Sequence, residues 1–118
     1  MKHHKKGRTL GRKKGPRTAL LRSLARSLVL HEKITTTVAR AKELRPFIEQ
    51  LVSRSKKGDV ASRRFISARL GNSTDTVKKM HDTLATRYAT RPGGYTRIVK
   101  LGPLGKRRVD SAIIEFVK

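Results

Sequence analysis

The sequence predicts a small α/β or α+β domain, in which a mixed three-stranded sheet packs against about four helices and follows a basic N-terminal arm. Two observations carry this prediction. Apolar residues recur at helical spacing through much of the chain, and three short runs suit strands. The length of 118 residues also matches one domain, because single cores commonly serve roughly 100 to 200 residues. We expect the arm over residues 1–16 and one compact domain over residues 17–118.

The arm is strongly basic and contains no acid. Leu10 is its one sizeable apolar group, so it cannot build a core. Like charge at this density opposes compaction, and we expect the arm to become ordered only when an anion compensates the loss of chain entropy. The cations of residues 1–17 are Lys2, Lys5, Lys6, Arg8, Arg12, Lys13, Lys14 and Arg17.

A first amphipathic helix is predicted over roughly 17–31, where Pro16 suits the first helical turn. Its apolar face consists of Leu20, Leu21, Leu24, Ala25 and Leu28. Arg22 and Arg26 lie one turn apart elsewhere on the helix. This basic side is either simply solvated or binds phosphates, and the pattern leaves both alternatives open.

A second helical pattern runs from Ala41 to Val52, with Pro46 inside it. An interior proline removes one hydrogen bond and crowds a carbonyl, so we expect this helix to start late or to kink. Lys56-Lys57-Gly58 suits its C-terminal stop.

Two further helices are predicted from their capping residues. Asp59 is a plausible N-cap for the first, which Gly71 closes, and Ser73 or Thr74 can cap the second. The second helix presents an apolar stripe of Val77, Met80, Leu84 and Tyr88. We expect this stripe to lie in the core.

Three short segments suit strands. The run 34–38 is β-branched and too short for a helix of its own. Segments 95–101 and 111–117 follow the turn-like residues 91–94 and are separated by a loop, which most simply gives an antiparallel hairpin. The glycines of that turn indicate positive φ, and glycine also permits a backbone to approach phosphate.

Charge is the strongest functional indication, because 30 Lys and Arg face only 8 Asp and Glu, leaving a formal net charge of +22. Such a chain favours a polyanion that neutralises it and releases condensed counterions, so the expected partner is nucleic acid. Residues 87–108 also contain seven cations and no acid. If the arm and the loop of the hairpin meet on one side of the fold, they form a continuous polyanion-binding face.

Several classes of function are disfavoured. The absence of cysteine excludes disulfides and thiolate zinc sites, and no Gly-x-Ser-x-Gly motif or other catalytic constellation is present. His3 and His4 lack a second pair at ligand spacing, so we expect no metal and no cofactor. No window has 18 apolar residues and no secretory h-region is present, which favours a cytosolic protein without a membrane partner. Five aromatic residues are too few for a stacking platform, and Tyr95 either touches nucleic acid or packs in the core.

Four stretches carry a family resemblance. They are Met1-Lys2-His3-His4 with Gly7-Arg8, Ile34 to Thr37, Ala41 to Arg45, and Arg91 to Gly102. Together they resemble large-subunit ribosomal protein 17 of bacteria, and the match spans nearly the whole chain. The resemblance implies a compact α/β domain lodged in large-subunit rRNA near the rim of the polypeptide exit tunnel, with the arm inserted among RNA helices. It implies no catalysis.

The resemblance also implies particular rRNA contacts. Carried over residue by residue, they are Lys2, His3, Arg8, Arg12, Arg17, Arg22, Arg91, Tyr95 and Arg97. Charge alone adds Lys5, Lys6, Lys13, Lys14, Lys106, Arg107 and Arg108. The other implied partners are neighbouring large-subunit proteins, with one copy per subunit, no homo-oligomer and no small-molecule substrate.

We expect phosphate neutralisation to supply most of the affinity and RNA shape most of the specificity. Two rival classes remain. The charge alone would suffice for a DNA-compacting or RNA-chaperone protein, and a small nuclease would cleave RNA in the presence of magnesium.

Overall fold

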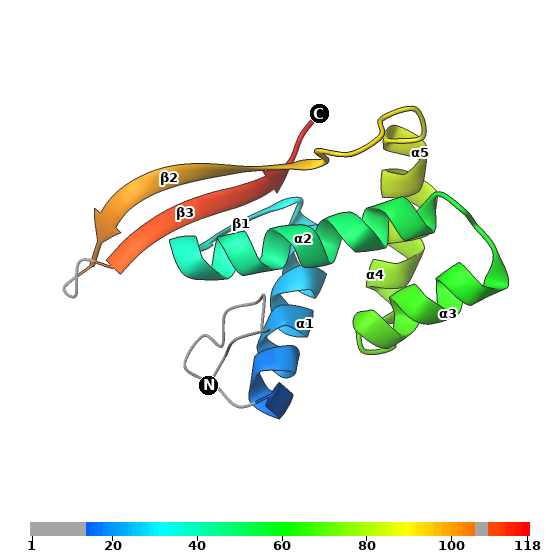
Figure 1. The fold of residues 1–118 in the computed structure, drawn as a ribbon, viewed down its shortest axis with the longest axis horizontal. Helices are drawn as coiled ribbons and strands as arrows, with labels where there is room; N and C mark the ends of the chain where they lie inside the picture. The colour runs from blue at the N-terminus through cyan, green and yellow to red at the C-terminus, as the bar shows by residue number, and fades with distance from the viewer. Residues whose placement is uncertain (1–13, 106–108) are drawn as a thin grey trace, which may run out of the picture.

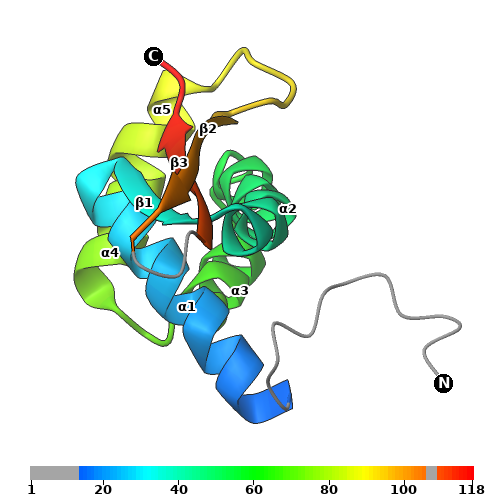
Figure 2. The ribbon, with the colours of Figure 1, turned by 90° about the vertical axis from the view of Figure 1, so that its left-hand side faces the viewer.

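The computed structural model describes residues 14–105 and 109–118, which form helices packed beside a small sheet (Figures 1 and 2). The helices are α1 Lys14–His31, α2 Val38–Ser55, α3 Val60–Arg69, α4 Thr74–Lys79, the π-helical segment η1 Met80–Leu84 and α5 Ala85–Arg87. The strands are β1 Lys33–Thr37, β2 Thr96–Leu104 and β3 Val109–Phe116. The last three helical segments follow one another without a break, so the described chain has about four helices and the predicted fold class is confirmed.

The sheet has the order β1-β3-β2, and both neighbouring pairs are antiparallel. The predicted hairpin is therefore confirmed, but the prediction of a mixed sheet is wrong. β1 and β2 run in the same direction, yet β3 returns from the hairpin and lies between them, so no parallel pair forms. A register shift between Lys100 and Gly102 interrupts the hairpin ladder, and Gly102 has a φ of 82°.

The core lies between the sheet and the helices. Alternate residues of β3, namely Ala112, Ile114 and Phe116, are buried. α2 lies along the sheet and contributes Ala41, Leu44, Ile48, Leu51 and Val52 to the same core (Figure 1). From α1, only the C-terminal part of the predicted apolar face is fully buried, because the N-terminal turns of this helix extend beyond the core (Figure 2).

α2 begins at Val38 and continues through Pro46, so the alternative of a late start is wrong. Thr37 caps the helix, since its Oγ1 accepts a hydrogen bond from Arg40 N at 3.2 Å. Pro46 cannot donate to the carbonyl of Lys42, but both residues are exposed, and water can hydrate that carbonyl. The buried neighbours Leu44 and Ile48 hold the helix on both sides of the proline.

The predicted helix boundaries after α2 are confirmed. Gly58 and Gly71 both have a φ of 67°, and each follows the end of a helix. Asp59 caps α3 through Oδ1, which accepts a hydrogen bond from Ser62 N at 2.7 Å. Ser73 stands at the N-cap of α4 without a capping side-chain hydrogen bond.

The predicted stripe of the last helix lies largely in the core. Met80, Leu84 and Tyr88 are buried, and Val77 packs at the margin. The sequence did not indicate the wider π turn that carries Met80 and Leu84. Within the described ranges, no helix is both long and apolar enough to cross a membrane.

Glu32 joins the last helix to the sheet. Its carboxylate accepts a hydrogen bond from Arg87 Nη1 at 2.5 Å and lies 3.3 Å from Lys79 Nζ. Its backbone carbonyl accepts a hydrogen bond from Phe116 N at 3.0 Å, at the end of β3. The hydrogen bond from Arg87 is the main reason why the pKa of Glu32 falls from 4.5 to about 2.

Replacing Glu32 with Gln is expected to lower the free energy of unfolding at neutral pH by about 1 kcal/mol, because the side chain is 38% exposed and water screens the pairs. The folded pKa lies below the unfolded one. The stabilisation is therefore present above about pH 4.5 and is lost as the pH falls towards about 2. Urea unfolding of both proteins at neutral and acidic pH measures this difference. If the difference in free energy of unfolding between wild type and variant stayed constant from neutral to acidic pH, the ion pairs of Glu32 would not contribute to stability.

Candidate nucleic-acid interface

Several of the few acids have structural roles. Glu32 holds Arg87 and Lys79, and Asp59 caps α3. Glu49 accepts hydrogen bonds from Thr96 N at 3.2 Å and from Thr96 Oγ1 at 2.8 Å. The ion pairs that the structure shows between described residues involve four cations, Arg45, Lys79, Arg87 and Arg97. Most of the positive charge is therefore not neutralised within the fold.

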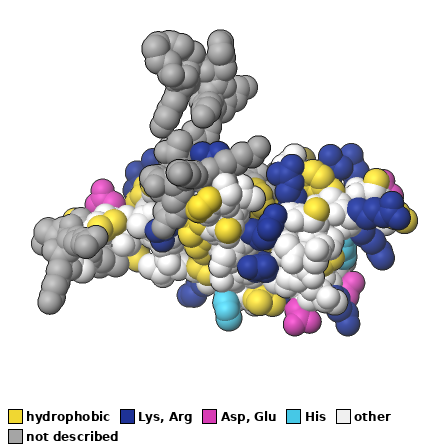
Figure 3. Space-filling model, turned by 90° about the horizontal axis from the view of Figure 1, so that it is seen from below, with side chains coloured by type: hydrophobic (Ala, Val, Ile, Leu, Met, Phe, Trp, Pro, Cys, Tyr) yellow, Lys and Arg dark blue, Asp and Glu magenta, His cyan; other side chains and the backbone are white. Residues whose placement is uncertain are grey.

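Two helices, α1 and α3, contain basic residues and no acid. Their arginines are Arg17, Arg22 and Arg26 on α1, and Arg63, Arg64 and Arg69 on α3. Figure 3 looks onto the side where both helices lie in Figure 1 and shows basic side chains across this face, with acidic ones near its margins. We call this side the α1–α3 face. It is the strongest candidate for a polyanion among the described surfaces.

The basic side of α1 packs against the turn between α3 and α4. A Cβ atom added to Gly71 would lie 2.7 Å from Arg22 Cδ and 2.8 Å from Arg26 Nη1. Gly71 also has a φ of 67°, so glycine suits both the turn and the close approach of the two arginines. The Nε atom of Arg22 is buried without a hydrogen-bond partner. These arginines therefore lie against the protein rather than extending freely into solvent.

A second group of predicted contact residues lies around the turn before β2. Arg91 is exposed, and its Nε donates a hydrogen bond to Gly93 O at 3.1 Å. Gly93 and Gly94 have φ values of 154° and 64°, which confirms the predicted turn. Arg97 is 65% exposed, but its Nε lies 2.6 Å from a carboxylate oxygen of Glu115.

The structure does not bring the two groups together. In Figure 1 the turn between α5 and β2 lies at the top of the molecule, whereas α1 descends from the opposite side of the sheet. Arg17 and Arg22 therefore belong to one surface, and Arg91 and Arg97 belong to another.

Tyr95 occupies a core position. It is 1% exposed, and its ring centroid lies 5.1 Å from that of Tyr88. Lys56 Nζ lies 4.9 Å from the same ring, and the Tyr95 hydroxyl hydrogen-bonds with Ser53 Oγ at 3.1 Å. This environment favours the packing alternative, because no ring face is left for a nucleobase.

Many predicted contacts lie outside the described residues. This applies to the arm residues Lys2, His3, Lys5, Lys6, Arg8, Arg12 and Lys13, and to Lys106, Arg107 and Arg108 of the hairpin loop. The prediction that arm and loop form one continuous face also concerns these segments. Lys14 begins α1.

The sequence interpretation missed a cluster between α2 and α3. The guanidinium carbons of Arg54 and Arg69 lie 4.2 Å and 4.8 Å from the centroid of the Phe65 ring. The contact between Phe65 and Arg69 could have been predicted from their i,i+4 spacing on α3. Arg54 comes from another helix, so its contribution depends on tertiary packing.

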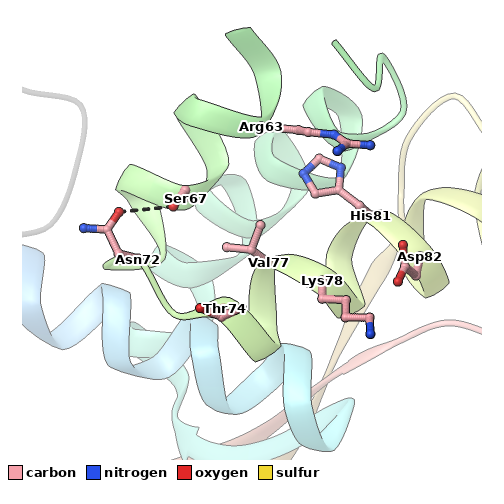
Figure 4. A pocket seen from close by; sticks show the side chains of 8 residues that line it. All are labelled: Arg63, Ser67, Asn72, Thr74, Val77, Lys78, His81 and Asp82. Atoms are coloured by element: carbon pink, nitrogen blue, oxygen red, sulfur yellow. Dashed lines mark hydrogen bonds between the residues drawn. The ribbon is translucent and has the colours of Figure 1, made fainter. Parts of the chain in front are cut away.

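A pocket of about 340 Å³ lies on the other flank of α3, against α4 and η1 (Figure 4). His81 points towards Arg63 there, and burial and the charge of Arg63 lower the pKa of His81. Ser67 donates a hydrogen bond to Asn72 Oδ1 at 3.1 Å at the opposite end of the pocket, so it forms no pair with His81. Among the residues that the structure describes, no three His, Asp or Glu side chains gather to hold a metal ion.

Comparisons with known proteins agree with the sequence resemblance. Residues 20–117 match the family model described as Ribosomal protein L17. The chain is 49% identical over 117 residues to Large ribosomal subunit protein bL17 of Sphingopyxis alaskensis, a match covering 99% of this chain and 84% of that protein. The protein of the same name from Erythrobacter litoralis is 45% identical over 117 residues, covering 99% and 83%. That from Allorhizobium ampelinum is 44% identical over 118 residues, covering 100% and 83%.

Proposed function

The chain belongs to the ribosomal protein L17 family, and from this premise we propose that it is a structural constituent of the large ribosomal subunit that binds rRNA. Its role is structural and not catalytic. The observation that supports rRNA binding best is the α1–α3 face, on which two helices without acids present their arginines together. Neighbouring large-subunit proteins are further partners, and we propose one copy per subunit without a homo-oligomer.

Phosphate groups are the ligands that this surface suits. A guanidinium presents several donors in a fixed plane and can bind phosphate oxygens through two parallel hydrogen bonds. Each phosphate that is neutralised releases condensed counterions, which makes binding favourable and dependent on salt. Such contacts carry little information on base sequence, so specificity comes from the shape of the folded RNA.

The proposed contacts fall into two groups of different strength. The arm and the N-terminal part of α1, including Arg17 and Arg22, supply the main electrostatic contact. Arg91 and Arg97 form a smaller second contact, which Glu115 weakens by pairing with Arg97. The three cations at positions 106–108, which follow β2 in the sequence, add to the positive charge. Tyr95 is not part of the interface, because it is buried.

Competition between two nucleic acids tests this function against the nearest rival. Labelled large-subunit rRNA fragments are bound to the full chain and then challenged with unlabelled structured rRNA or with duplex DNA. We expect rRNA to compete at least about 100-fold better than DNA near physiological salt, because shape recognition adds to the shared electrostatic attraction. Equal competition would instead indicate a general nucleic-acid-binding protein, and magnesium-dependent cleavage of the label would indicate a nuclease.

A further inference from the structure

The cluster of Arg54, Phe65 and Arg69 is built around one aromatic ring. Both guanidinium groups contact the same ring, at 4.2 Å and 4.8 Å from its centroid. Arg54 lies near the end of α2 and Arg69 near the end of α3, so the ring joins two helices. Phe65 is half-buried and packs against the core, which fixes the ring that both arginines contact.

An aromatic ring and a carboxylate hold an arginine side chain in different ways. Arg97 is held by Glu115, and that ion pair neutralises its charge. The Phe65 ring attracts guanidinium groups through its quadrupole but carries no net charge, so both arginines keep their full positive charge. They also lose side-chain freedom before a ligand arrives, which reduces the entropic cost of binding. The cluster is therefore a pair of preorganised cations.

The surroundings of the cluster add further positive charge. The turn at Gly71 follows Arg69 closely in the chain and contacts Arg22 and Arg26 of α1. The pKa of Asp59 is lowered mainly by its capping hydrogen bonds with Ser62, and the charge of Arg54 contributes least among the causes. α3 itself contains no acid. This distribution of charge suits a polyanion better than an acidic protein segment, which would supply fewer negative charges at such close spacing.

We propose that Arg54, Phe65 and Arg69 form an rRNA-binding site separate from the arm, in which the two arginines bind backbone phosphates of a folded RNA segment. The proposal rests on the proposed function and adds the α2–α3 junction to the surface that contacts rRNA. Phe65 acts as a positioning residue, because it orders both arginines without touching the RNA itself.

Three variants of the full chain test this site by measuring affinity for large-subunit rRNA fragments between about 50 and 200 mM salt. The double variant Arg54→Gln/Arg69→Gln removes two charges. Its matched control is Arg45→Gln/Lys79→Gln, which removes two charges that are paired with the carboxylates of Glu49 and Glu32 and lie in neither proposed contact. The third variant, Phe65→Leu, keeps both charges and removes the ring.

We expect the Arg54/Arg69 variant to bind about 10- to 100-fold more weakly and to lower the slope of log affinity against log salt by roughly 1.5, as expected for two phosphate contacts. The control should change the affinity by less than about 3-fold, because its two cations are already paired with carboxylates. Phe65→Leu should weaken binding by about 3- to 10-fold with little change in the salt slope, since both charges remain but the ring no longer holds the arginine side chains in place. Thermal melts confirm that each variant is folded.

Two outcomes would contradict the proposed rRNA-binding site. One is an Arg54/Arg69 variant that binds rRNA with the affinity and salt slope of its control. The other is a folded Phe65→Leu variant that binds like the wild type, which would remove the role of the ring. Failure of the proposed function is recognised separately, because the wild type itself would then show no preference for rRNA over duplex DNA.

Discussion

Deletion of residues 1–13 is expected to weaken rRNA binding by about 1000-fold at physiological salt. The deleted segment carries six cations and no acid, Lys2, Lys5, Lys6, Arg8, Arg12 and Lys13. If each neutralises one phosphate, the slope of log affinity against log salt should fall by about 4 to 5. Filter binding of full-length and truncated chains to the same rRNA fragment, over a range of salt concentrations, measures both quantities.

A full-length variant with glutamine at the same six positions is the matched control, since it keeps the length of the arm and loses its charge. We expect it to bind like the truncated chain if phosphate neutralisation dominates. Both should melt like the wild type, because the described core begins within α1. Retention of full affinity by the glutamine variant would show that contacts other than charge hold the arm.

Replacement of Leu44 with Ala is expected to lower the free energy of unfolding by about 2 to 5 kcal/mol. Leu44 is fully buried on α2, where the helix packs against the sheet, and truncation leaves a cavity in addition to the lost burial. Small domains have only about 5 to 15 kcal/mol in total, and strong like charge opposes compaction further. The RNA-free variant should therefore unfold at much lower urea concentration than the wild type.

Lys42→Ala on the same helix is the matched control, because Lys42 is exposed and its replacement should change stability by less than about 0.5 kcal/mol. An rRNA fragment should raise the melting temperature of the Leu44 variant, since a ligand of the folded state stabilises that state. Equal unfolding curves for the two variants would contradict the assignment of the core.

The sequence was most informative where structure depends on local chemistry. Asp59 caps its helix as predicted, because a capping carboxylate acts on a backbone N–H only three residues away. The hairpin of β2 and β3 was predicted from two strand-like runs separated by a longer loop. The continuation of α2 through Pro46 was not predictable in this way, because buried side chains on both sides hold the helix against the cost of the proline.

The sequence was less informative where distant segments meet. The antiparallel sheet depends on β3 lying between β1 and β2, which no local pattern specifies. The sequence around Tyr95 suits both nucleic-acid contact and packing, and only the tertiary fold places Tyr88, Lys56 and Ser53 around it. The cluster at Phe65 could not be predicted from the sequence, because it forms only when α2 packs on α3.

Sedimentation of a cell lysate, with the chain quantified by mass spectrometry in each fraction, tests the central claim most directly. A protein that is a structural part of the large subunit should migrate with that subunit at low salt, in proportion to its other proteins. High salt should release part of it, because counterions then compete for the rRNA phosphates. Recovery of the chain only in the slowly sedimenting fractions at low salt, with none on the large subunit, would contradict the claim.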